Sequence, residues 1–193
     1  MISGVVLAAG TGSRFGSTKQ LVVVDGKPLA QHAIDALAAA GIGEIVVVTG
    51  HDAVHVASAL QLPATARIVW NKAFRDGQAS SLAAALHVLD DDSEAAVVLM
   101  ADQPGVTSDV IHALVTRFLA TRKQVVRAMY ADGPGPSLLS REIYAEAGHL
   151  HGDVGARILI ASNPAWVEEV TVAGPAPRDI DLPSDLQGED VSP

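Results

Sequence analysis

Short runs of apolar, mostly β-branched residues alternate along this chain with longer helical patterns. The runs lie at residues 4–9, 45–50, 66–70, 95–101 and 124–130. Runs of this kind predict strands that are buried on both faces of a sheet. Between them, residues 28–40 and 108–122 show the apolar spacing and end signals of helices. Repeated strand–helix–strand order predicts an α/β fold, Rossmann-like and doubly wound, with a mainly parallel sheet and helices on both faces.

The rhythm changes after residue 130. Residues 131–137 ("ADGPGPS") have the composition of a turn, and residues 148–157 form a polar glycine loop. Residues 166–172 predict a strand outside the parallel series. We expect this half to form a lid or a wall for a second substrate. The length predicts one domain over residues 1–186, and we expect the polar residues 187–193 to be a disordered tail.

The charge balance excludes several classes of partner. The chain has 13 Lys plus Arg against 22 Asp plus Glu, a formal charge of −9. This acidity argues against nucleic acid or an anionic membrane as the main partner. The absence of cysteine excludes disulfides, thiolate metal sites and a cysteine nucleophile. No apolar run reaches the ~18 residues of a membrane span, and no basic leader is apparent, so we expect a soluble cytoplasmic protein.

A glycine loop with two nearby cations follows the first predicted strand, in "VVLAAGTGSRFGSTKQL" (residues 5–21). Successive backbone N–H groups in such a loop converge on one point and form an anion site, which suits a phosphate. The loop lacks the Lys-Ser or Lys-Thr of a P-loop, and its glycines are spaced G-x-G-x-x-x-G, unlike a dinucleotide fingerprint. The alternative is a tight turn in which Arg14 and Lys19 are merely solvated.

Five sequence blocks resemble, in order, those of nucleotidyltransferases that activate an acceptor with an NTP. They are "LAAGTGSRFGSTKQL", "NKAFRDGQASSLAAAL", "VLMADQPGV", "GDVGAR" and "DIDLPSDL", which together span residues 5–186. Among these families the chain is most similar to the molybdenum cofactor cytidylyltransferases. Their loop reads A-A-G, as Ala8-Ala9-Gly10 does here, whereas the guanylyltransferase relatives have A-G-G. The resemblance therefore implies a nucleotidyltransferase fold and CTP rather than GTP.

Most of the candidate site residues lie in the first two blocks. The resemblance implies nucleotide contacts by Leu7, Ala8, Ala9, Gly10, Thr11, Gly12, Arg14, Lys19, Asn71, Gly77, Ser80 and Ser81. Nucleotidyl transfer builds negative charge on the phosphates, so cations that hold the triphosphate serve catalysis directly. Arg14 and Lys19 fit that role. Alanine side chains cannot read a base, so recognition at Ala8 and Ala9 would use the main chain. Ordinary helix capping explains Ser80 equally well.

Asp102 is the candidate metal ligand. It follows the apolar run of the third block, which places its carboxylate at the carboxyl edge of the sheet, where ligands bind in such folds. Mg²⁺ usually takes one or two carboxylates plus substrate phosphates. The resemblance pairs Asp102 with an acid of the last block, Asp181 in preference to Asp179. The alternatives are a turn aspartate at position 102 and an acidic turn that leads into a short helix at residues 179–186.

The fourth block implies the acceptor side of the site. The resemblance assigns acceptor contacts to His151, Gly152, Asp153, Gly155 and Arg157. A metal site at His149, His151 and Asp153 is a weaker interpretation, because such residues on a glycine loop more often contact substrate or solvent. The chain also departs from its relatives nearby: where they carry Gly-His-Pro, this chain has "GPGPSLLSR".

The resemblance implies a reaction as well as a site. CTP would bind with Mg²⁺, and the terminal phosphate of molybdopterin carrying molybdenum would attack the α-phosphorus and release pyrophosphate. A phosphomonoester is largely a dianion at neutral pH, so no general base is required. A molybdenum hydroxylase would receive the product. The alternatives are a guanylyl- or cytidylyltransferase for another phosphorylated metabolite or sugar phosphate, and a non-catalytic nucleotide-binding or cofactor-binding chaperone.

Overall fold

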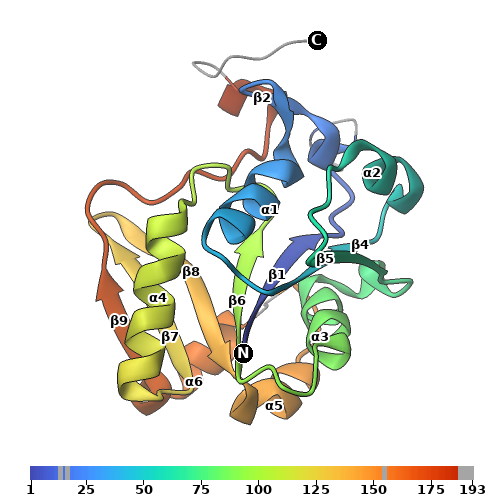
Figure 1. Cartoon of the computed structure of the whole chain (residues 1–193). Coiled ribbons are helices and arrows are strands. Elements are labelled where there is room, and N and C mark those ends of the chain that lie inside the picture. The colour runs from blue at the N-terminus through green and yellow to red at the C-terminus, as the bar shows by residue number, and fades with distance from the viewer. Residues whose placement is uncertain (13–14, 16–17, 154–155, 187–193) are drawn as a thin grey trace.

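A seven-stranded sheet forms the centre of the molecule. The computed structural model describes residues 1–12, 15, 18–153 and 156–186. In sheet order the strands are β5 (Ala66–Trp70), β4 (Glu44–Thr49), β1 (Ile2–Ala8), β6 (Ala95–Met100), β8 (Gly133–Ser140), β7 (Val125–Tyr130) and β9 (Val167–Thr171). The sheet is flanked by helices, as Figure 1 shows. The expected α/β, Rossmann-like architecture is confirmed, and all five predicted strands are present.

Strands β5, β4, β1 and β6 run parallel, as predicted. Strand β8 is antiparallel to both of its neighbours. The prediction that residues 166–172 lie outside the parallel series was wrong in one respect, because β9 pairs in parallel with β7. It forms the edge of the sheet beyond β7.

The predicted turn at residues 131–137 is mostly strand β8. Its prolines, Pro134 and Pro136, adopt extended backbone, and they lie where β8 pairs only with β7. The missing proline N–H groups are tolerated there because the other side of the strand has no partner. Pairing with β6 stops at Val98 and Ser137. Beyond that pair β6 and β8 diverge (Figure 1), and the sheet opens at its carboxyl edge.

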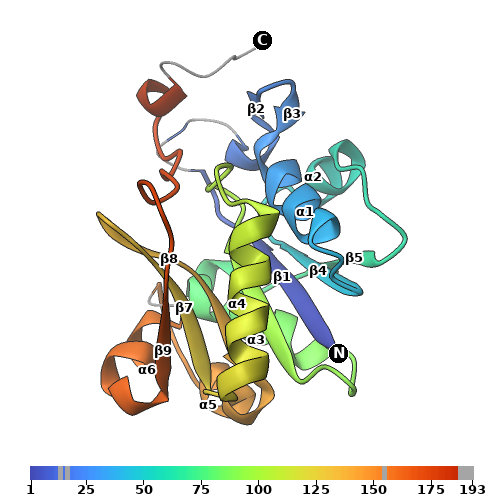
Figure 2. The same ribbon diagram turned by 60° about the vertical axis from the view of Figure 1, so that its left-hand side comes forward.

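Helices cover both faces of the sheet. One face carries α1 (Leu29–Ala39), α2 (Ala53–Ala59) and α4 (Ser108–Thr121), and the other carries α3 (Gln78–Val88), α5 (Tyr144–Gly148) and α6 (Arg157–Ser162). Figure 2 shows this arrangement from the side. The small pair β2 (Val23–Val24) and β3 (Lys27–Pro28) precedes α1. Single 3₁₀ turns lie at Lys19–Leu21, Phe74–Asp76, Arg141–Ile143, Pro164–Trp166 and Pro183–Leu186.

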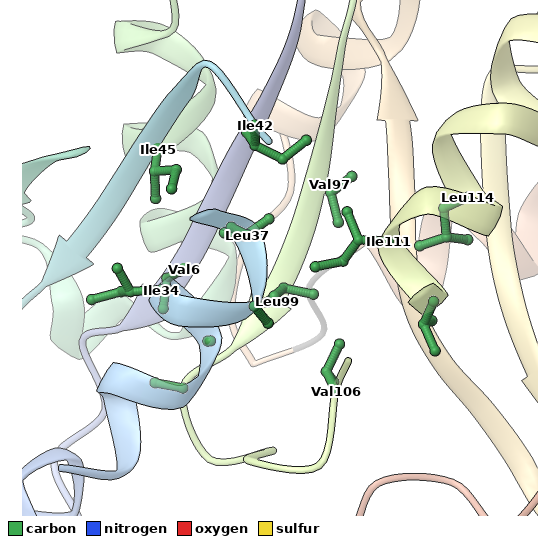
Figure 3. Packing of buried hydrophobic residues seen from close by; sticks show 14 of the residues in the cluster. Val6, Ile34, Leu37, Ile42, Ile45, Val97, Leu99, Val106, Ile111 and Leu114 are labelled. Atoms are coloured by element: carbon green, nitrogen blue, oxygen red, sulfur yellow. The ribbon is translucent and has the colours of Figure 1, made fainter. Parts of the chain in front are cut away.

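The alternating side chains of β1 enter two separate cores. Val6 packs with α1 and α4, whereas Val5 packs with α3 and α5. Figure 3 shows part of the first of these clusters, in which Leu37 of α1 and Ile111 of α4 lie beside the strands of the sheet. Helix α1 approaches β1 closely, because a Cβ on Gly4 would lie 2.8 Å from the Leu37 side chain. The sheet is thus a rigid base for the loops at its carboxyl edge.

No helix within the described part of the chain combines the length and apolar content needed to cross a membrane.

Candidate active site

A cleft of about 800 Å³ opens at the carboxyl edge of the sheet. Its walls come from the glycine loop after β1, the turn after β6, the first turn of α3, strand β8, the start of α6 and the segment 179–181. Ligands of open α/β sheets bind at this edge. All five sequence blocks therefore meet around one cavity, although they span most of the chain.

The described part of the glycine loop lines the cleft with Gly10, Thr11 and Gly12. Gly12 has φ +59°, a conformation that favours glycine. The buried side chain of Gln20 holds the loop from behind, because its amide Nε2 donates to the carbonyl of Gly10 at 2.8 Å. Arg14, the other predicted cation, lies outside the described residues. Of the alanines, Ala9 lines the cleft, whereas Ala8 points into the core.

Lys19 lies between two carboxylates from distant parts of the chain. Its Nζ donates to Oδ2 of Asp102 at 2.9 Å and to Oδ1 of Asp181 at 2.7 Å. Only 12% of its side chain is exposed. Burial alone would lower the pKa of Lys19, but the hydrogen bonds and charges of the two aspartates outweigh that effect and raise it. The ammonium is therefore fixed in its charged form on the floor of the cleft.

The carboxylate of Asp102 is only partly satisfied by protein groups. Its Oδ1 is buried and has no hydrogen-bond partner in the described structure. Its main-chain carbonyl accepts from the amide of Ile180 at 3.0 Å, and this bond joins the turn after β6 to the segment 179–181. A buried carboxylate oxygen without a donor is costly unless a ligand completes it. Asp102 thus carries the acceptor oxygen expected of a cation ligand.

The two aspartates of the last block have different surroundings. Asp181 shares Lys19 with Asp102, and Asp185 accepts from its amide at 2.8 Å. Asp179 instead accepts a hydrogen bond from the side-chain Nε2 of Gln103 at 2.9 Å. Burial raises the pKa of Asp179, and the nearby charges of Asp102 and Asp181 add to that rise. The described residues contain no cluster of three or more metal-ligating side chains.

Asn71 and Ser80 organise the loop before α3 from the interior. Buried Asn71 donates to the hydroxyls of Ser80 at 2.9 Å and Ser81 at 3.0 Å. The hydroxyl of Ser80 donates in turn to the carbonyls of Ala73 and Gly77. Among these three polar side chains, Ser81 lines the cleft, whereas Asn71 and Ser80 do not. The helix begins at Gln78, with Gly77 as its N-cap, so Ser80 does not cap it.

The predicted acceptor loop accepts hydrogen bonds from the first turn of α3. The amide of Ala79 donates to the carbonyl of Gly152 at 3.0 Å, and that of Gln78 donates to Oδ1 of Asp153 at 3.2 Å. These contacts require Gly77, because a Cβ there would lie 2.3 Å from the carbonyl carbon of Gly152.

The remaining acceptor-loop residues differ in position. Asp153 and Arg157 line the cleft, and His151 does not. Gly155 lies outside the described residues.

Sequence reasoning missed several lining residues. They are Gln20, Arg75, Gln78, Gln103, Arg127 and the β8 segment 134–137. Gln78 follows Gly77 and Gln103 follows Asp102, so the two glutamines could have been selected as neighbours of predicted site residues. Arg127 gave no such signal, because only the pairing of β7 with β8 brings it to the cleft.

Comparisons with known proteins show the family to which the chain belongs. The model of the MobA-like NTP transferase domain matches residues 4–170. The chain belongs to the MobA-like NTP transferase family. It is 30% identical to the bifunctional protein GlmU of Agrobacterium fabrum over 67% of this chain and 29% of that protein. It is 39% identical to the bifunctional enzyme IspD/IspF of Novosphingobium aromaticivorans, over 60% of this chain and 30% of that enzyme. The match thus spans about 30% of the length of these two relatives.

Solved structures resemble this member of the MobA-like NTP transferase family over nearly its whole length. The crystal structure of Rv0371c from Mycobacterium tuberculosis superposes with a TM-score of 0.86 and 30% identity, and covers 96% of this chain and 95% of that one. Rv0371c has also been crystallised in complex with manganese; that structure has a TM-score of 0.82 and 29% identity, with 96% of each chain covered.

Proposed function

We propose that this protein transfers CMP from CTP to the terminal phosphate of the molybdenum-carrying molybdopterin cofactor. One observation carries the proposal: Lys19, Asp102 and Asp181 converge beside a glycine loop in a single cleft. A phosphate oxygen of the acceptor would attack the α-phosphorus of CTP. The bond from that phosphorus to the bridging oxygen of the β-phosphate would break, and pyrophosphate would leave.

The charges of the site suit a triphosphate. The chain as a whole is acidic, so an anionic substrate needs local donors. The amides of the glycine loop and the ammonium of Lys19 supply them on one side of the cleft. Lys19 is a compact charge with three donors, so it can exchange a carboxylate for a phosphate oxygen while it keeps its other contact. Arg14 completes the set in the proposal.

A divalent cation, Mg²⁺ or Mn²⁺, fits the two carboxylates. Asp102 has a buried oxygen without a donor, and Asp181 shares Lys19 with it. Oxygen ligands from one or two carboxylates, completed by substrate phosphates, are what Mg²⁺ requires. When bound, the cation would neutralise charge on the triphosphate and on the departing pyrophosphate. The manganese complex of Rv0371c supports a divalent cation for this family of folds.

The choice of CTP and of the acceptor rests on the sequence. Ala8-Ala9-Gly10 favours CTP over GTP, and Ala9, which lines the cleft, would contact the base through its main chain. A phosphate acceptor has a second pKa of about 6 and is already nucleophilic at neutral pH. It therefore needs no general base from the protein. A molybdenum hydroxylase is the proposed recipient of the product.

The test is an assay of pyrophosphate release. The purified protein is incubated with Mg²⁺, each of the four NTPs and molybdenum-loaded molybdopterin, with an acceptor-free control for each. We expect acceptor-dependent release with CTP far above GTP. Release with GTP alone would show that the nucleotide is GTP and that the assignment of CTP is wrong. Binding of CTP without release from any NTP would favour either another phosphorylated acceptor or a non-catalytic nucleotide-binding protein.

A further inference from the structure

Arg127 of strand β7 lines the cleft away from the triphosphate cations and has no assigned role. Its side chain is 23% exposed, and its Nη2 donates to Oε1 of Glu169 at 2.6 Å. Its Nε is buried and has no hydrogen-bond partner in the described structure. A guanidinium has five N–H donors, and this bond to Glu169 uses one of them. The residue thus brings a positive charge and unused donors to the cavity.

Register shows where this charge lies. Val98 of β6 is paired with Ser137 of β8, Ser137 with Arg127, and Arg127 with Glu169 of β9. Residues paired in this way share one face of the sheet, so the four form a row across it. Val98, Ser137 and Arg127 of this row line the cleft. These three residues form one wall of the cleft, next to the point where β6 and β8 separate.

Arg127 and Asp102 lie on different strands and at different heights of the sheet. Strand β6 continues from Val98 to Met100, roughly 7 Å along the strand direction, and Asp102 lies in the turn that follows. Two strand spacings separate β6 from β7, which adds roughly 10 Å across the sheet. The guanidinium of Arg127 is therefore placed for a substrate group other than the phosphate that lies beside Asp102.

The neighbouring segment of β8 lines the cleft beside Arg127, through Pro134, Gly135, Pro136 and Ser137. Gly135 is required by packing, because a Cβ there would lie 2.4 Å from the Tyr130 ring. The backbone thus runs close to the ring, and the hydroxyl-bearing Ser137 stays next to the arginine.

We propose that Arg127 binds an acidic group of the acceptor, remote from the attacking phosphate, and that Glu169 holds its guanidinium in place. This inference rests on the proposed nucleotidyl transfer and specifies its acceptor as a molecule with a second anionic group, a phosphate or a carboxylate. Both groups suit the planar donor fork of arginine. Arg127 is a binding residue for substrate, and Glu169 is a positioning residue.

The first test observes the guanidinium directly. Nitrogen-15-labelled protein is titrated with phenyl phosphate or benzoate in the presence of CTP and Mg²⁺, and the arginine Nε–H signals are followed. We expect the signal that is missing in Arg127→Gln to shift with one or both probes. The probe that shifts it more strongly identifies the acidic group as phosphate or carboxylate. An Arg127 signal unmoved by either probe overturns the inference.

Matched variants separate binding from folding. In Arg127→Gln we expect at least about tenfold weaker binding of the effective probe, with CTP affinity within about threefold of wild type. Arg117→Gln is the control, because Arg117 of α4 forms a similar pair with Glu168 and does not line the cleft. Arg127→Lys, which keeps the charge, should retain part of the affinity. Equal probe affinity in Arg127→Gln and Arg117→Gln would overturn the inference.

The two proposals fail differently in these experiments. If wild-type protein binds no NTP but the probe still shifts the Arg127 signal, the nucleotidyltransferase proposal falls and the anion site stands. If CTP binds and pyrophosphate is released but the signal does not move, only the Arg127 inference falls. With an active acceptor, Glu169→Gln should raise KM several-fold and leave kcat within about twofold. An effect on kcat alone would contradict the positioning role of Glu169.

Discussion

The ammonium of Lys19 lies 2.9 Å from Oδ2 of Asp102, although 83 positions separate the two residues in the chain. Asp181 joins them from near the end of the described chain. This contact ties the glycine loop, the turn after β6 and the C-terminal segment into one unit. One ammonium faces two carboxylates, and Oδ1 of Asp102 has no donor in the described structure, so the cluster retains negative charge for a cation.

Replacing Asp102 by asparagine should separate catalysis from binding. The amide keeps the shape of the side chain but removes its charge, so it can no longer neutralise a cation. We expect pyrophosphate release to fall by about 100-fold or more, with CTP affinity within about threefold. Asp91→Asn is the control, because the Asp91 side chain is fully exposed and pairs with Arg141, away from the cleft. Unchanged turnover in Asp102→Asn would remove Asp102 from the catalytic site.

Asparagine substitutions at Asp179 and Asp181 decide which of them assists Asp102. Asp181 and Asp102 both accept a hydrogen bond from the ammonium of Lys19, whereas Asp179 accepts one from the side chain of Gln103. We therefore expect Asp181→Asn to lose about tenfold or more in turnover and to need more Mg²⁺ for half-maximal activity. Asp179→Asn should stay within about threefold. The opposite ranking in a Mg²⁺ titration would transfer the role to Asp179.

The parallel half of the sheet could be predicted from the sequence. Strands β1, β4 and β6 are largely buried on both faces, so they appear as continuous apolar runs. The expectation of burial on both faces was wrong for β5, an edge strand in which Arg67 and Trp70 are exposed. Strand β8 was missed because its glycines and prolines signal a turn in isolation. Only a neighbouring strand on one side, with none on the other, makes that composition acceptable in a sheet.

The site was predictable where motif and strand end coincide. Lys19, Asp102 and Asp181 each lie in a recognisable block, and the structure brings them together. Whether the individual residues bind nucleotide, metal or acceptor stays a prediction. Arg127 could not be found in this way, because its place in the cleft depends on the register of β7 with β8. Nor did the sequence indicate that the carboxylate of Asp153 would accept a hydrogen bond from the first turn of α3.

The stability contributed by Lys19 should depend on pH in the alkaline range. Asp102 and Asp181 raise the pKa of Lys19 above its ordinary value of 10.5, despite the opposing effect of burial. The folded protein therefore holds this proton more tightly than the unfolded chain. The stabilisation is fully present below the unfolded pKa and is lost as the pH rises through the folded pKa.

The measurement is the free energy of unfolding by urea, without metal or nucleotide, for wild type and Lys19→Met. The difference between them should be constant from pH 7 to 9 and shrink above about pH 10.5. Lys27→Met is the control, because its pair with Asp35 is half exposed. A difference that stays constant to pH 12 would show that the two aspartates do not hold the ammonium in solution.

Alanine at Gly77 should disturb both the fold and the cleft. Gly77 has φ +98°, which strains any residue with a Cβ, and that Cβ would lie 2.3 to 2.8 Å from main-chain atoms of Gly152 and Asp153. Backbone atoms cannot move aside as a flexible side chain can, so the loop at residue 152 must shift from the start of α3. We expect the free energy of unfolding to fall by about 2 kcal/mol or more and the melting temperature to fall by about 4–8 °C.

Gly148→Ala is the control, because a Cβ there meets no atom within 4 Å. Since the shift also frees the amides of Gln78 and Ala79, CTP affinity should change in Gly77→Ala and not in Gly148→Ala. Equal melting temperatures for the two variants would show that the close approach of the two loops is absent in solution.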